Sequence, residues 1–298
     1  MDYFEIVRNS YKIALKQKYL WIFGMLAGGY GGYRSFGLNY SSGSSEWQKA
    51  FENNSTNFDF ASFWLSYGAI ILTLIAILTV FGLVMYIIGI VSQGALIGSV
   101  KKISINEKNN FKIGFLLGWH NFWRILGVNI LYFLMILASL ILLIGPVALL
   151  VVSHQYILAI IWGILLFFVD LIFWLLVSFI SPYSLRVVVL EKLSVWESIR
   201  HSLHMVRDNL GKVIVMYLLL YAISIGVGIA VILAVLFIGG LLLAIGFGLL
   251  LASKIMAIIY AIIAGLAVLI GFMVFAGAYN AFYSSALTLT YLELSKKS

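Results

Sequence analysis

The sequence predicts an all-α integral membrane protein with six transmembrane helices in three inside-out-inside hairpins, each preceded by an amphipathic interfacial helix. Of its 298 residues, 63% are hydrophobic and only 10% are charged, whereas a soluble domain is nearer half apolar and a quarter charged. Several uncharged stretches far exceed the roughly 18 residues that indicate a membrane span. These stretches are residues 60–100, 125–169, 213–253 and 255–292.

The first unit starts with a basic amphipathic segment, residues 1–18. Its apolar side chains recur every three or four residues, which places them on one helical face and most of the cations on the other. These apolar residues are Phe4, Val7, Tyr11 and Leu15. A positive start before the short apolar run 19–33 also describes a cleaved signal peptide. The amphipathic pattern recurs deep inside the chain, which favours a retained first span.

A polar loop and a long apolar stretch complete this unit. Residues 34–59 are rich in Ser, Asn and Gly, which predicts an irregular loop. Residues 60–100 form the second span. A helix of this length reaches roughly 60 Å, twice the ~30 Å hydrocarbon core, so part of it must protrude, tilt or lie along the interface.

The second unit repeats this order. A basic segment, 101–112, and a set of aromatic residues at helical spacing precede a span at 125–144. We expect Gly145–Pro146 to end or kink this span. The polar residues 153–155 separate it from the next span, 156–181.

The third unit carries the strongest amphipathic segment, 195–212, followed by a span at 213–237. Glycines between residues 239 and 248 predict an interruption, so the piece up to Lys254 is interpreted as interfacial or re-entrant. The last span starts at Ile255. It contains pairs of small residues at a spacing that lets helices approach closely in lipid. These pairs are Ala261 with Gly265 and Ala267 with Gly271.

The distribution of basic residues orients the chain. With six spans, only Arg34, Lys49 and Lys254 of the 19 Lys and Arg residues fall on the side opposite the termini. The positive-inside rule then places both termini in the cytoplasm. An eight-span alternative would divide each of the last two apolar stretches, leaving spans shorter than the ~20 residues normally needed.

We predict one transmembrane domain, residues 1–298, built from three parallel repeats. Phe4–Ser10 aligns without a gap with Trp196–Ser202, with Glu, Arg and Ser at matching positions. Parallel repeats occur in several membrane folds. The competing explanation is that any two basic amphipathic helices beside a membrane resemble each other without being repeats. The predicted units are residues 1–100, 101–194 and 195–298.

Several loose motifs resemble a broad group of prokaryotic membrane proteins, similar to the membrane domain attached to some glycerophosphoryl diester phosphodiesterases. The motifs are Lys18–Gly29, Ser92–Ile97, Val187–Glu191, Trp196–Arg200 and Asn209–Lys212. The resemblance implies a six-helix domain of a prokaryotic inner (cell) membrane. It implies no catalysis, because the phosphodiesterase chemistry of such proteins belongs to a separate soluble domain.

Asp170 is the candidate polar site inside the membrane. An ionisable group deep in a span is costly and suggests a function by default. It could be a proton or cation site, with His154, Tyr183 or Arg186 nearby in the fold. A protonated or hydrogen-bonded carboxylate that merely holds helices together is the alternative.

The cations and aromatics of the amphipathic segments are candidates for binding lipid headgroups. Each cation near an anionic leaflet contributes about 1 kcal/mol, and tryptophan suits the headgroup region. Simple anchoring and orientation of the helices explain the same pattern. The candidates are Arg8, Lys12, Lys16, Lys101, Lys102, Lys112, Arg124, Trp196, Arg200, Arg207 and Lys212.

No catalytic, metal or cofactor site is expected. The chain has no cysteine, which removes thiolate catalysis and cysteine ligands. His201 and His204 have a spacing that can chelate a metal, but no further ligand is close in sequence, so a solvated polar face is favoured. The formal charge of +8 is explained by membrane orientation, and we expect no nucleic-acid partner.

These observations predict a non-enzymatic membrane module that interacts with lipids, above all anionic ones, or organises a protein partner or a second copy of the chain. The alternative is a small transporter or channel that uses Asp170.

Overall fold

The computed structural model describes residues 1–31 and 60–296, and every regular element within these ranges is an α-helix. The short helices are α1 (Tyr3–Lys16), α2 (Tyr19–Gly31), α5 (Phe111–His120) and α8 (Val195–Asp208). The long helices are α4 (Phe60–Ser104), α6 (Phe122–Val152), α7 (Tyr156–Leu190), α9 (Leu210–Ala252) and α10 (Lys254–Ser295).

Three of the short helices begin at a polar cap. The side chains of Asp2 and Asn110 accept hydrogen bonds, of 3.0 and 2.9 Å, from backbone N–H groups of the first turns of α1 and α5. Ser194 and Glu197 form a capping box at the start of α8, in which each side chain accepts from the other residue's backbone N–H. Such caps satisfy donors that a helix start leaves free.

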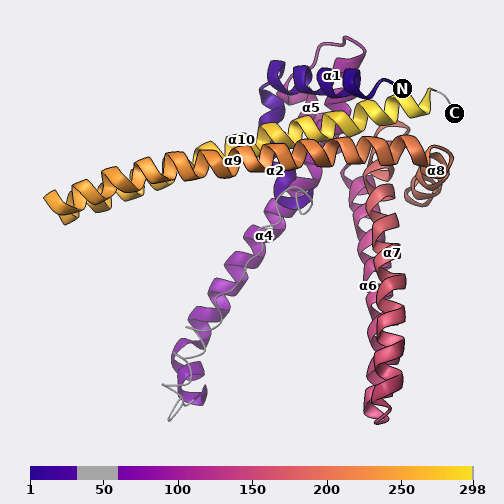
Figure 1. Ribbon diagram of the computed structural model, residues 1–298, viewed down its shortest axis with the longest axis horizontal. Helices are drawn as coiled ribbons and strands as arrows, with labels where there is room; N and C mark the ends of the chain where they lie inside the picture. The colour runs from indigo at the N-terminus through magenta and orange to yellow at the C-terminus, as the bar shows by residue number, and fades with distance from the viewer. Residues whose placement is uncertain (32–59, 297–298) are drawn as a thin grey trace.

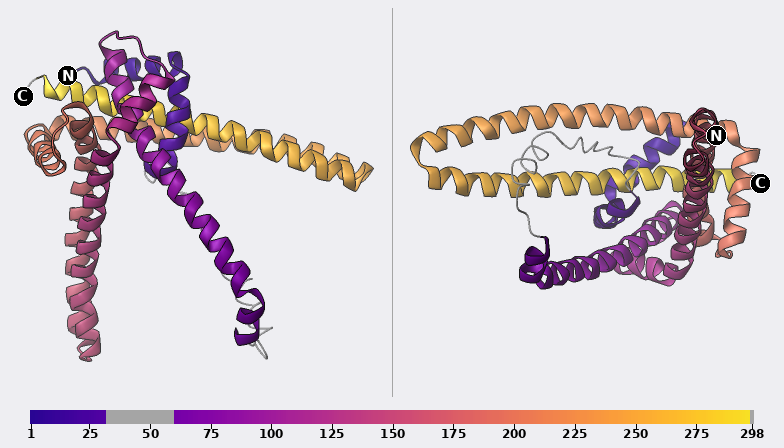
Figure 2. Two further views of the ribbon diagram at one scale, coloured as in Figure 1. Left: turned by 180° about the vertical axis from the view of Figure 1, so that it is seen from behind. Right: turned by 90° about the horizontal axis from the view of Figure 1, so that it is seen from below.

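Three arms of long helices diverge from a common region, which contains α1, α5, α8 and the adjoining ends of the long helices and which we call the head (Figures 1 and 2). In Figure 1, α6 and α7 run down the view side by side, α4 slants away from them, and α9 and α10 run across the view. Both termini lie at the head, and α1, α5 and α8 lie there as well. The long helices therefore do not form one parallel bundle.

The buried core lies in the head, where the arms meet. One cluster joins α1, α2, α4, α9 and α10 around Phe23 and Leu220. A second joins α4, α6 and α7 around Ile125, and a third joins α7, α8, α9 and α10 around Tyr183 and Tyr291. By contrast, 0% of the most apolar stretch of α6, α9 or α10 is buried. Apolar surface on this scale requires lipid as its solvent.

The chain is a multi-pass membrane protein by this criterion. Five helices in the described ranges are long and apolar enough to cross a membrane: α4, α6, α7, α9 and α10. The predicted first span corresponds to α2, whose 13 residues fall short of the ~20 that a crossing normally needs. The polar loop predicted at 34–59 lies outside the described residues. Six spans and their hairpin topology therefore stay predictions.

The predicted interruption of α9 is wrong, the predicted break at 153–155 is confirmed, and Gly145–Pro146 does not end α6. Helix α6 continues past Gly145–Pro146 to Val152, and the chain then turns at 153–155 as expected. Helix α9 runs without a break through the glycines between 239 and 248. In lipid the backbone has no competing hydrogen-bond partner, so a helix tolerates glycine that would break it in water. The eight-span alternative requires a turn inside each of α9 and α10, and both helices are continuous.

Glycines bring helices together in the head, but not those that the sequence indicated. A Cβ atom added at Gly24 of α2 would lie 2.1 Å from the carbonyl oxygen of Gly277 in α10. A Cβ atom at Gly118 of α5 would lie 2.0 Å from the carbonyl oxygen of Val91 in α4. At Gly265 and Gly271 a Cβ atom would meet nothing within 4 Å, so the predicted small-residue pairs of α10 are not helix contacts.

Candidate functional site

A groove runs along the inner side of the α9–α10 arm and ends beneath α1. Its volume is about 1370 Å³, and residues of α1, α9 and α10, together with Trp21, line it. We call it the α9–α10 groove. Among the described residues that line it, Arg8 is the one charged side chain, and nearly all the others are apolar.

Small side chains leave the space that forms this groove. Alanine and glycine recur along both facing helices at positions 230, 234 and 239 of α9 and 264, 267, 271 and 278 of α10. The pair Ala267–Gly271, predicted to let helices touch, instead lines an open channel. Between α9 and α10, two hydrogen bonds join the helices. The hydroxyl groups of Ser224 and Tyr279 form a 2.5 Å hydrogen bond near the head. Further out, the Tyr260 hydroxyl donates a 3.2 Å hydrogen bond to the Leu242 carbonyl.

Helix α1 covers the head end of the groove with an apolar stripe. The helix packs on the head through Ile6, Ser10 and Ala14. The stripe predicted from the sequence lies on another face, where Phe4 remains 77% and Tyr11 57% exposed. Both side chains line the groove, as does Arg8 one helical turn from Phe4. An apolar channel thus ends at a guanidinium group.

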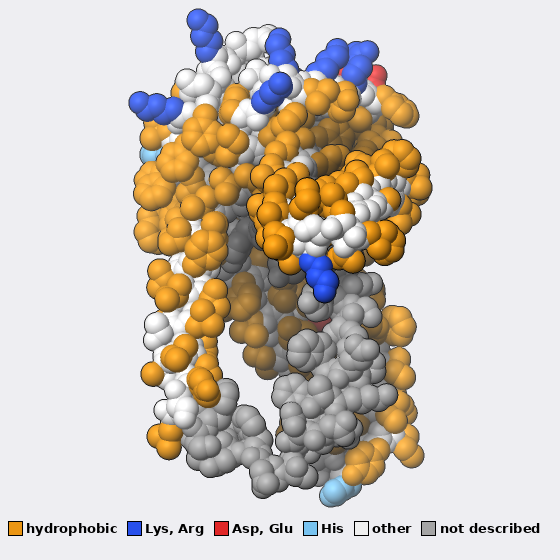
Figure 3. Space-filling view, turned by 90° about the vertical axis from the view of Figure 1, so that its left-hand side faces the viewer, with side chains coloured by type: hydrophobic (Ala, Val, Ile, Leu, Met, Phe, Trp, Pro, Cys, Tyr) orange, Lys and Arg blue, Asp and Glu red, His pale blue; other side chains and the backbone are white. Residues whose placement is uncertain are grey.

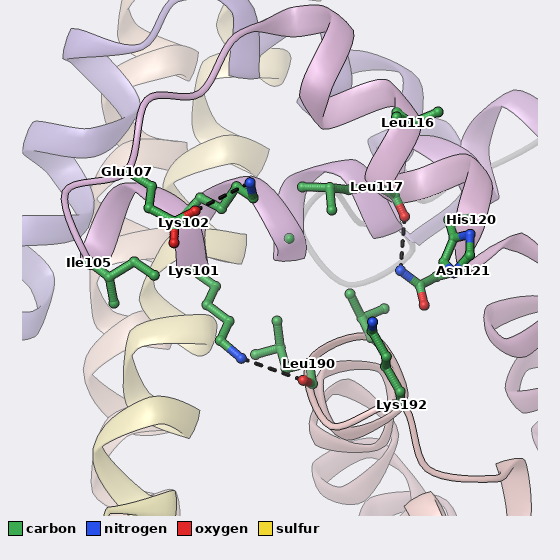
Figure 4. A pocket seen from close by; sticks show the side chains of 12 residues that line it. Lys101, Lys102, Ile105, Glu107, Leu116, Leu117, His120, Asn121, Leu190 and Lys192 are labelled. Atoms are coloured by element: carbon green, nitrogen blue, oxygen red, sulfur yellow. Dashed lines mark hydrogen bonds and ion pairs between the residues drawn. The ribbon is translucent and has the colours of Figure 1, made fainter.

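A second cavity, lined by several cations among apolar side chains, lies on the head between α4, α5 and the end of α7. Its volume is about 450 Å³, and we call it the basic pocket. Lys101, Lys102 and Lys192 line it, with His120 at the end of α5 (Figure 4). One carboxylate lines it, that of Glu107, which forms a 3.2 Å ion pair with Lys102.

The predicted headgroup residues lie at the head, mostly on its surface. Figure 3 shows most of the Lys and Arg side chains on this face along the top of the molecule, above broad hydrophobic surfaces, with a further cation lower down, beneath the arm that points toward the viewer. Lys101, Lys102, Arg124 and Lys212 are half-buried. The exposed members are Arg8, Lys12, Lys16, Lys112, Trp196, Arg200 and Arg207. The amphipathic segments therefore keep their polar faces exposed.

Asp170 lies near the middle of α7, apart from the residues predicted as its companions. His154 lies at the far turn of this arm, and Tyr183 and Arg186 lie in the head. At 1.5 Å per residue, each is roughly 20 Å or more from Asp170 along the arm. The expected cluster is therefore wrong. Asp170 lines neither the groove nor the basic pocket.

Arg186 is a buried cation that sequence reasoning did not single out as a site of its own. It is 4% exposed. Its guanidinium donates to the Pro182 carbonyl within α7 and, at 3.2 Å, to the Ser284 carbonyl of α10. Tyr183 is fully buried beside it. An arginine placed between Pro182 and a β-branched run was the available signal, and the contact it makes fastens two arms together.

Two further polar contacts hold α8 and α10 on the head. Tyr291 donates a short hydrogen bond to the Glu191 carboxylate, and His201 lies 3.8 Å from the same carboxylate. His201 thus faces Glu191. Within residues 1–31 and 60–296, no group of three His, Cys, Asp or Glu side chains is placed to hold a metal ion.

Comparison with known proteins gives one match. Residues 19–294 match the model of DUF7544, a family of unknown function. No curated protein and no solved structure matches the chain. The match supports membership of an uncharacterised family, and nothing in it links the chain to the membrane domains of glycerophosphoryl diester phosphodiesterases.

Proposed function

We propose that this chain, which belongs to the DUF7544 family of unknown function, is a non-enzymatic membrane module that binds a lipid in the α9–α10 groove. The observation that carries the proposal is the shape and chemistry of this groove. The groove is long, apolar and open along one arm, and at its head end it is lined by Arg8 of α1. A hydrocarbon chain matches its walls, and a negatively charged headgroup matches its end.

The length of the groove fits an acyl chain. Its α9 wall extends from Ile223 to Leu242, which is about 28 Å along a helix. Half of a hydrocarbon core is about 15 Å thick, so the groove has room for a chain that spans one leaflet. An occupied groove would also cover apolar side chains that line it on both helices.

Cations on α1 would hold the headgroup. Arg8 lines the groove, and Lys12 lies one turn further along α1 on the exposed surface. A guanidinium binds phosphate or carboxylate oxygens through paired donors. Further cations of the head would add about 1 kcal/mol each in an anionic leaflet. This favours an anionic lipid.

The same cations favour a cytoplasmic head. The positive-inside rule would place both termini, with α1, α5 and α8, at the cytoplasmic face of a prokaryotic inner membrane. The groove would then open to the inner leaflet. Transport through Asp170 is not favoured, because this side chain lines neither cavity described above.

The test measures the lipid that remains with the protein after gentle purification, by native mass spectrometry. Leucine at both Gly239 and Gly271 would place two apolar side chains in the groove, and a Cβ atom at either position has no neighbouring atom within 4 Å. The double variant Gly239→Leu/Gly271→Leu is expected to lose most of the bound lipid.

A matched control separates the groove from a general effect of added leucines. Gly240 and Gly265 lie on the same two helices, also face open space, and do not line the groove. Gly240→Leu/Gly265→Leu should keep the lipid of the parent protein. Equal lipid occupancy in both double variants would show that the groove holds no lipid.

A further inference from the structure

We propose that the basic pocket binds a phosphate group, carried either by the headgroup of an anionic lipid or by a small phosphorylated solute. The pocket is separate from the α9–α10 groove: α4, α5 and the turn after α7 form it, and none of these elements lines the groove. In its lipid form the inference rests on the proposed function, and in its solute form it does not.

Charge is the first argument. Three ammonium groups from two different parts of the chain converge on one cavity, and a single carboxylate, Glu107, lines it with them. Lys102 pairs with that carboxylate. Within residues 1–31 and 60–296, neither Lys101 nor Lys192 forms an ion pair. An anion with two or more oxygen acceptors satisfies such a pair of donors.

The placement of Lys101 is the second argument. Its ammonium group donates to the carbonyl of Leu190 at 3.4 Å, which is near the end of α7. This bond uses one of its three donors and positions the half-buried side chain. Figure 4 shows the ammonium group of Lys101 at the Leu190 carbonyl and Lys192 on the other side of Leu190, pointing toward Asn121 and His120.

The backbone of Lys192 is the third argument. Its φ of 59° lies in the left-handed region, two residues beyond the last residue of α7. Glycine is the usual residue at such a helix end because it adopts this conformation without a steric penalty. A lysine there destabilises the turn relative to glycine, which indicates that its side chain contributes something other than folding.

The walls of the pocket suit an amphiphile. Its volume, about 450 Å³, exceeds what a phosphate group alone occupies and falls in the range of small-molecule sites. Two apolar side chains that line it, Ile105 and Leu116, are 56% and 66% exposed. A glycerophosphate headgroup with its first methylene groups would contact both the cations and these side chains.

The experiment uses the full chain in a neutral detergent and measures binding of three soluble probes. Dioctanoyl phosphatidic acid represents the lipid source, glycerol 3-phosphate the solute source, and dioctanoylglycerol lacks the phosphate. We expect Lys192→Gln to weaken binding of a phosphate probe about tenfold, the effect of one charge-assisted hydrogen bond. Arg207→Gln removes one exposed cation of α8, which lines neither the basic pocket nor the groove, and should change it far less.

A second variant guards against a folding defect. Lys192→Gly removes the same side chain but suits the left-handed backbone, so it should unfold at a higher temperature and still lose binding. Binding of phosphatidic acid alone assigns the site to lipid, and binding of glycerol 3-phosphate as well assigns it to the phosphate group itself.

The outcomes separate this proposal from the groove. If Lys192→Gly and Lys192→Gln bind phosphatidic acid as the parent does, or if Arg207→Gln loses as much binding as they do, the basic pocket is not a phosphate site. If Gly239→Leu/Gly271→Leu loses its bound lipid while the Lys192 variants keep their binding of the phosphate probes, the data support the groove and contradict the basic pocket. The reverse pattern would support the pocket and remove the groove.

Discussion

Replacing Gly24 by alanine should disrupt the contact between α2 and α10. The new Cβ atom would lie 2.1 Å from the Gly277 carbonyl oxygen and 3.0 Å from the Ala281 nitrogen. A carbon–oxygen contact normally needs at least about 3.3 Å, so the two backbones would have to separate by about 1 Å. Neither neighbouring atom belongs to a side chain that could rotate away.

The expected cost follows from this overlap. Forcing one extra carbon into a packed site destabilises a protein by about 1–3 kcal/mol. The first core cluster contains Phe23, Ala27 and Ala281 around this crossing, so separation of the helices also loosens their packing. Each kcal/mol lowers the unfolding temperature by roughly 2–4 °C for a chain of this size class.

The assay is thermal unfolding of the purified protein in one detergent. Gly265→Ala on α10 is the control, because its Cβ atom meets open space, and it should be neutral or up to about 1 kcal/mol more stable through helix propensity. If Gly24→Ala unfolds at the same temperature as this control, α2 does not cross α10 as described.

Three further outcomes are expected. Lys192→Gly should stabilise the fold by about 1 kcal/mol, because a non-glycine residue in the left-handed region costs roughly that much; unchanged or lower thermal stability would contradict it. Asp170→Asn should leave the unfolding temperature and lipid content unchanged, because the carboxylate has no ion pair in the described chain, and a change in proton-coupled solute uptake in vesicles would instead revive the transport alternative. Ser194→Ala should cost about 1 kcal/mol through loss of the α8 cap. Hydrogen bonds from Ser194 lower the pKa of Glu197, so this carboxylate's contribution is present above its unfolded pKa and is lost as the pH falls through its folded pKa; a Ser194→Ala variant whose stability falls as steeply in acid as the parent's would refute that assignment.

Helix content and the membrane class follow from the sequence because they depend on composition and local spacing. The uncharged stretches predicted as spans correspond to the long helices, and the polar break at 153–155 is the turn between α6 and α7. The prediction of an interruption at the glycines of α9 was wrong, because the rules for glycine derive from helices in water. Lipid removes the solvent that would compete for the backbone.

The cavities depend on tertiary arrangement and were not predictable in the same way. Ala267 and Gly271 have the spacing of a helix contact, yet they line the groove. The groove extends along α9 and α10 between the two hydrogen bonds that join these helices. Lys192 carried no pattern at all in the sequence. Its role depends on a positive φ and on Lys101 arriving from another helix. The stripe of α1 was predicted correctly as a stripe, but its partner is the groove rather than the protein core.

The arms of this molecule meet one another in the head and extend separately beyond it. Helices α9 and α10, of 43 and 42 residues, are each about 63 Å long or more, which is about twice the thickness of the hydrocarbon layer. Neither can stand upright in a flat bilayer with all of its apolar surface covered. Such an arm must lean steeply, or the surrounding lipids must thicken locally to cover it.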